Sequence, residues 1–188
     1  MIRTVTLPLS FCLSLAVSAQ LTINTDLSQA QVADLLEGLG VSVTNVVIDC
    51  PGVSMGQFSG TSELGISQGL VLTTGHAADV AGDAAAFAST VMQGAGDPDL
   101  TVYTGLDTYD ACAVSFDCIP YGDTLAFNFA FGSEEYPEFV SSSFNDVFGI
   151  FMSGPGINGP FTNNAENIAW VPGTTVPVSI NNVNGGIN

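Results

Sequence analysis

The chain has 188 residues, of which 18 are acidic and only one, Arg3, is Lys or Arg, so its formal net charge is −17. This balance excludes most nucleic-acid binding and an electrostatic grip on anionic lipid headgroups, because both require clustered cations. Hydrophobic residues make up 46% and charged residues 10%. Disordered chains combine high charge with low hydrophobicity, so we expect a folded domain.

Residues 1–19 have the layout of a secretory signal peptide. Arg3 gives a positive start, an apolar run follows from Leu7 to Val17, and small residues lead to a cleavage site after Ala19. The stretch is too short to span a membrane, and no other apolar run is long enough to insert into one. We therefore expect a secreted or cell-surface protein whose mature chain begins at Gln20 and contains no Lys or Arg.

Residues 25–38 form the one segment with clear helical periodicity, with Thr25 or Asp26 as the expected N-cap. The rest of the chain predicts short strands separated by turns, and residues 76–98 a long loop. The expected strands cover residues 41–48, 69–74, 111–119, 124–131, 146–152, 168–171 and 176–180.

Residues 124–131 carry the clearest strand pattern, which places Leu125, Phe127, Phe129 and Phe131 on one face, expected to point inward. Strands without intervening helices favour an antiparallel arrangement. We therefore expect a mainly β fold, an antiparallel, jelly-roll-like β-sandwich with one N-terminal helix. Residues 20–188 would form a single domain.

Three cysteines follow the predicted cleavage site, and export would permit a disulfide. Cys112 and Cys118 are placed on one predicted strand, about 20 Å apart, beyond the reach of a disulfide. Cys50 could pair with either Cys112 or Cys118. The alternative is three unpaired, buried thiols.

Acidic residues are clustered, and the mature chain offers no cation to pair with them. Such carboxylates either stay solvated or bind a hard cation through oxygen ligands. We therefore consider both a solvated acidic surface and a calcium site built from several loops. The candidate ligands of the calcium ion are Asp97, Asp99, Glu134, Glu135 and Asp146.

Two patterns raise the question of catalysis. Glu134, Glu135 and Glu138 could supply the paired carboxylates of a glycan-active hydrolase, although neighbouring strand residues point to opposite faces. Residues 65–69 match G-x-S-x-G, but a strand is expected after this motif where the nucleophile elbow requires a helix.

Several blocks resemble the choice-of-anchor L domain of bacterial secreted and surface proteins. The most specific are Gly132-Ser133-Glu134-Glu135-Tyr136-Pro137-Glu138-Phe139 and Phe144-Asn145-Asp146-Val147-Phe148-Gly149. The resemblance runs from about residue 25 to the end. It implies a surface or secreted module whose members differ in their C-terminal anchoring signal, and it carries over no catalytic residues. It also implies that the domain continues beyond Asn188, so we expect this one to be incomplete at its C-terminal end.

We therefore expect a non-catalytic extracellular or cell-surface module for adhesion or ligand display, with calcium as its one candidate cofactor. Its expected partner is a surface ligand, either a protein or a glycan. The alternatives are the glycan-active hydrolase and a structural spacer domain.

Overall fold

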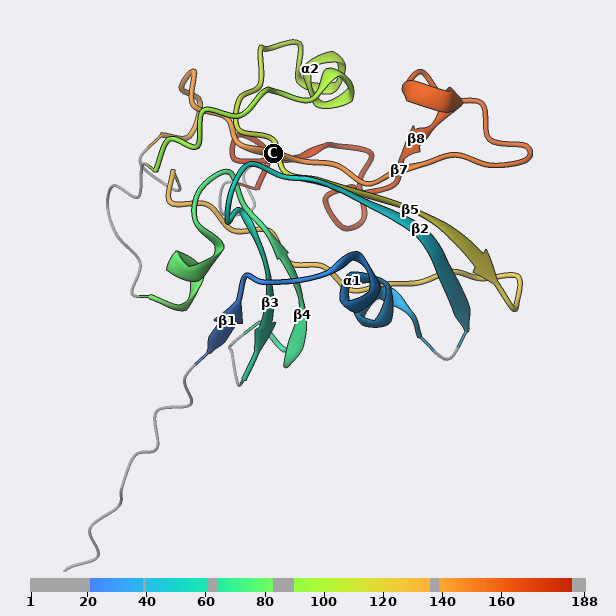
Figure 1. Ribbon diagram of the computed structural model, residues 1–188. Coiled ribbons are helices and arrows are strands. Elements are labelled where there is room, and N and C mark those ends of the chain that lie inside the picture. Colours follow the sequence, from blue (N-terminus) through green and yellow to red (C-terminus); the bar gives the residue numbers. More distant parts are fainter. Residues whose placement is uncertain (1–20, 39, 61–63, 83–89, 136–138, 184–188) are drawn as a thin grey trace, which may run out of the picture.

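The computed structural model describes residues 21–38, 40–60, 64–82, 90–135 and 139–183. Its strands pair antiparallel and its helices are few and short, as the sequence predicts (Figure 1). The predicted signal peptide, residues 1–19, lies outside the described residues. In chain order the elements are β1 (Thr22–Asn24), α1 (Gln29–Leu36), β2 (Val41–Asp49), β3 (Met55–Ser59), β4 (Gln68–Leu72), the 3-10 turn η1 (Ala77–Ala81), α2 (Pro98–Thr104), β5 (Ala113–Pro120), β6 (Val147–Phe148), β7 (Phe151–Met152), η2 (Thr162–Asn164), β8 (Glu166–Asn167) and β9 (Val178–Ser179).

Helix α1 begins later than the sequence pattern predicts. Its N-cap is Ser28 and not Thr25 or Asp26, because Ser28 and Gln31 form a capping box in which each satisfies the other's backbone N–H. The helix ends at Leu36, where Glu37 returns to extended backbone. Its inward face carries Val32, which is fully buried.

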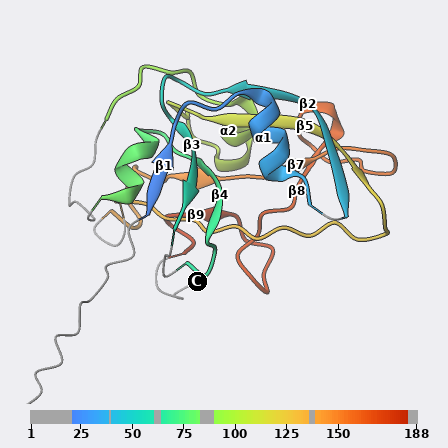
Figure 2. The same cartoon turned by 60° about the horizontal axis from the view of Figure 1, so that its bottom comes forward.

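The main core lies between α1 and the sheets of the N-terminal half. β2 pairs with β5, and β3 lies between β1 and β4, all antiparallel. Helix α1 packs against β2 and β4, and Figure 2 shows it lying close to both. The buried side chains of this core are Val32, Val43, Val46 and Met55.

The C-terminal half contains two short antiparallel pairs, β6–β9 and β7–β8. The prediction of a single strand over residues 146–152 is wrong, because this segment is divided between β6 and β7. The division coincides with the buried amide of Asn167, whose side-chain oxygen accepts a hydrogen bond from the Ile150 amide at 2.9 Å. A side-chain acceptor thus takes the place of a backbone partner in the ladder.

Residues 124–131 differ most from expectation. No described strand pairs with them, and Leu125, Phe127 and Phe129 are 36, 47 and 38% exposed. The expectation that this face points into the core is therefore wrong. In both views the chain after β5 runs back across the molecule in one extended pass (Figures 1 and 2).

Candidate functional site

The first two predicted calcium ligands, Asp97 and Asp99, hold the start of α2, a helix that the sequence analysis did not predict. Asp97 is its N-cap, and its carboxylate accepts hydrogen bonds from the amides of Asp99 and Leu100 at 2.9 Å. Asp99 accepts from both the amide and the hydroxyl of Thr162 at 3.0 Å. Gly105 ends the helix in the left-handed conformation, with φ 71°.

Asp110 has a similar role in the loop before β5. Its carboxylate accepts hydrogen bonds from the backbone amides of Met92 and Gly94. Carboxylates without cationic partners are thus used here to satisfy backbone N–H groups, which otherwise would be costly to bury.

A second network contains two more of the predicted ligands, Glu135 and Asp146. The Ser133 hydroxyl donates to Asp146 Oδ2 at 2.6 Å and accepts from the Glu135 amide at 3.1 Å. Burial and the negative charge of Asp146 raise the pKa of Glu135 above its ordinary value. Glu134 is exposed beside this network, and Glu138 lies outside the described residues.

Four of the five predicted calcium ligands therefore take part in two hydrogen-bond networks, one at α2 and one around Ser133, and Glu134 is exposed beside the second. Within the described ranges, no group of three or more His, Cys, Asp or Glu side chains is placed to hold a metal ion. Glu135 and Asp146 repel each other electrostatically, and Ser133 bonds both the Asp146 carboxylate and the Glu135 backbone amide.

Two of the three cysteines in the described residues form a disulfide. It joins Cys50, just after β2, to Cys112, just before β5, and so ties together the ends of the two paired strands. Cys118 is a free thiol within β5, where it lies opposite Val43.

The G-x-S-x-G segment does not form a nucleophile elbow. Ser67 precedes β4, and its carbonyl accepts a hydrogen bond from the Gly60 amide in the connection from β3. A strand and not a helix follows the serine, as the sequence indicates.

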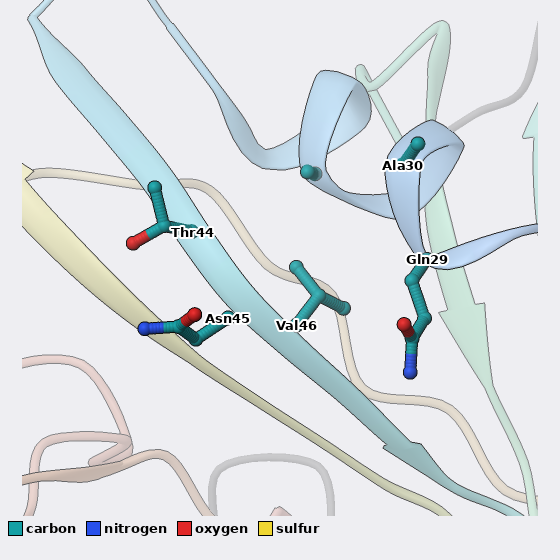
Figure 3. Close-up of a pocket in the computed structure, with 6 residues that line it drawn as sticks. Gln29, Ala30, Thr44, Asn45 and Val46 are labelled. Carbon is teal, nitrogen blue, oxygen red and sulfur yellow. The ribbon is translucent and has the colours of Figure 1, made fainter.

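The structure contains a shallow hollow between α1 and β2, of about 250 Å³, shown in Figure 3. At its edge Asn45 adopts a positive φ of 53° where the β2–β5 register is irregular, and its amide donates to Asp117 at 2.7 Å. The lining residues are Gln29, Ala30, Ala33, Thr44, Asn45 and Val46. None of these side chains titrates, so the hollow offers contact surface and not acid–base chemistry.

A second, apolar groove of about 380 Å³ lies along the unpaired segment 124–131. The sequence pattern does not predict this groove, because it predicts that these aromatic side chains lie in the core. The alternating pattern was the signal for an extended segment with one apolar face, but that pattern does not say what covers the face. The lining residues are Phe127, Asn128, Phe129, Phe131, Val171, Pro172, Val178 and Val183.

Comparison with known proteins places the chain in a family. The model of the choice-of-anchor L domain matches residues 20–188, so the chain belongs to the choice-of-anchor L domain family. This is a family of surface-associated, non-catalytic modules. No curated protein and no solved structure matches the chain. Across the described residues, no helix is both long enough and apolar enough to cross a membrane.

Proposed function

We propose that the chain is a non-catalytic module, secreted or exposed at the cell surface, that works in adhesion or ligand display. The observation that carries this proposal is the concentration of exposed, large apolar side chains between β5 and β6. They include Tyr121, Leu125, Phe127, Phe129 and Phe144, each at least 36% exposed. Exposed apolar surface of this kind is typical of sites that contact another molecule. Family membership supports the surface location.

The module would consist of residues 20–188, after removal of the signal peptide. Its ligand would be a protein or a glycan on another surface. Calcium belongs to the proposal as a stabilising ion, because a cation between Glu135 and Asp146 would relieve the repulsion that contributes to the raised pKa of Glu135.

The second candidate, a glycan-active hydrolase, is favoured by one observation. A carboxyl group that is kept protonated near neutral pH is what a general acid requires, and the pKa of Glu135 is raised in that direction. The acid would be Glu135, with Glu134 or Asp146 as the second carboxylate. A structural spacer domain is the third candidate.

One experiment separates the three candidates. Fluorescent beads coated with the purified chain are passed over a glycan array and a peptide array, and glycan solutions are assayed for release of reducing ends. The display function predicts that beads are retained on a subset of the probes and that no reducing ends are released. Release that Glu135→Gln abolishes would overturn the proposal in favour of the hydrolase. Absence of retention on every probe would overturn it in favour of the spacer.

A further inference from the structure

Residues 125–131 form a stretch of chain with the pattern of a strand but without the hydrogen bonds of one. Within the described part of the molecule, their backbone N–H and C=O groups make no hydrogen bond, and Thr124 bonds only through its side chain, to Asp123. All residues from Thr124 to Ala130 are exposed. The segment thus presents a row of open donors and acceptors, as an unpaired edge strand does.

One face of the segment is also prepared for side-chain contact. Phe127, Phe129 and Phe131 alternate along it and line the apolar groove of about 380 Å³. Phe129 is held in place by Phe148 of β6, with ring centroids 5.2 Å apart. The groove is also lined by Val171, Pro172, Val178 and Val183. A partner would therefore meet open backbone groups and an apolar hollow side by side.

We propose that residues 124–131 bind an extended peptide by β-strand addition, and that this peptide carries apolar side chains at alternate positions and basic residues at its ends. In this mode main-chain hydrogen bonds supply affinity and the hollows for alternate side chains supply specificity. The inference rests on the proposed display function and names the chemistry of its ligand.

The charges around the segment select this partner. Asp123 precedes the segment, and Glu135 and Asp146 follow it, where the Ser133 hydroxyl donates to the Asp146 carboxylate and accepts from the Glu135 amide. The described residues contain no Lys or Arg to balance these carboxylates. A cationic peptide end therefore finds a complementary carboxylate at each end of the segment, whereas a second copy of this chain would bring the same negative charge.

The test uses the full chain in calcium-free buffer and fluorescently labelled peptides, with binding followed by anisotropy. The first peptide alternates valine and threonine between two lysines at each end, and the matched peptide replaces these lysines by glutamates. We expect the lysine peptide to bind at least about tenfold more tightly than the glutamate peptide, with an affinity that falls as salt is added. Equal affinities, or no binding of either peptide, would overturn the inference.

A matched pair of variants locates the binding surface. Phe127→Ser removes a ring that lines the groove, while Phe116→Ser removes a similarly exposed ring on β5 that does not line it. We expect Phe127→Ser to weaken binding of the lysine peptide about tenfold or more, and Phe116→Ser to leave it within about twofold. Circular dichroism and the melting temperature check that both variants remain folded. Equal effects of the two variants would overturn the location.

The outcomes distinguish this inference from the proposed function. Retention of coated beads on the arrays, together with no binding of the lysine peptide, overturns strand addition and leaves the display function in place. Concentration-dependent dimerisation that Phe127→Ser abolishes, measured by sedimentation, would overturn the choice of a cationic peptide in favour of a second copy of the chain.

Discussion

At the scale of single residues, Tyr103 connects α2 to the C-terminal half of the molecule. Its ring packs edge-on against Phe151, Phe161 and Trp170, with centroids 5.9 to 6.5 Å apart. Its hydroxyl accepts a hydrogen bond from the Asn167 amide. Burial raises the pKa of Tyr103 above its ordinary value of 10.0, although the hydrogen bonds with Asn167 and the Val178 backbone act in the opposite direction.

This pKa predicts a loss of stability at alkaline pH. The folded state holds the Tyr103 proton more tightly than the unfolded state, so the stabilisation is fully present below about pH 10 and is lost as pH rises through the folded pKa. Urea unfolding of wild type and Tyr103→Phe between pH 8 and about 11 measures this loss of stability. The difference in unfolding free energy between the two proteins should shrink above pH 10. Tyr109→Phe, at an exposed ring, is the matched control. A constant difference across the range would contradict the prediction.

A variant of Asp110 tests how much a carboxylate that accepts hydrogen bonds from backbone amides contributes to stability. Asp110→Ala should destabilise the fold by about 1–3 kcal/mol, because the amides of Met92 and Gly94 lose their acceptor. Removal of one negative charge from a chain of net charge −17 should itself be slightly favourable, so the hydrogen-bond loss must outweigh it. Denaturant unfolding measures both this variant and Asp107→Ala, an exposed control expected to change stability by less than about 0.5 kcal/mol. Equal changes in stability for the two variants would contradict the prediction and indicate that the Asp110 carboxylate is only part of the solvated surface.

At the scale of elements, the Cys50–Cys112 disulfide closes a loop of 62 residues that contains β3, β4, η1 and α2. Closing a loop of this length restricts the unfolded chain and is worth about 4 kcal/mol in the chain-entropy model. Cys112→Ser should therefore lower the melting temperature strongly, whereas Cys118→Ser should lower it little. Thermal melts with and without reductant check this, and reductant should change wild type but not Cys112→Ser. Equal melting temperatures for wild type and Cys112→Ser would contradict the pairing.

The elements also show which parts of the fold the sequence pattern can predict. β2 and β4 fall close to their predicted positions, because β-branched and apolar runs bounded by glycine or polar residues indicate strands directly. The helix α2 was missed because it has only one apparent signal, the Asp97-Pro98 start, within a segment rich in alanine and glycine. Its length of seven residues is too short for periodicity to emerge.

Residues 124–131 show the opposite error, because a paired strand was predicted there and no strand in the described part of the chain pairs with them. The candidate groove lies along this unpaired segment. Alternation of apolar and polar residues indicates that a segment has two different faces, but pairing requires a neighbouring strand, which depends on the rest of the fold. Likewise the clustered carboxylates were visible in the sequence, whereas their backbone partners at α2 and before β5 are set by loop geometry. The sequence therefore indicated which side chains would make contacts, but it did not indicate which groups they would contact.

At the scale of the whole molecule, the net charge of −17 predicts that salt stabilises the fold by screening self-repulsion. Our calcium proposal adds a second, specific effect. A ligand that binds only the folded state stabilises it by about 2.7 kcal/mol at a hundredfold excess over its Kd. Thermal melts at fixed ionic strength, with sodium replaced by calcium, should show a gain that Asp146→Asn reduces and Asp107→Asn does not. The same gain with sodium alone would contradict calcium binding.

We propose a display module whose binding edge is the open segment at residues 124–131. Hydrogen–deuterium exchange of the full chain, followed by mass spectrometry with and without the lysine-flanked peptide, tests this most directly. In the free chain we predict fast exchange of the Leu125–Phe131 amides and slow exchange within β2, where the amides pair with β5. The peptide should slow exchange in 125–131 and leave β2 unchanged. Slow exchange of 125–131 in the free chain, or exchange there that the peptide does not alter, would contradict the account.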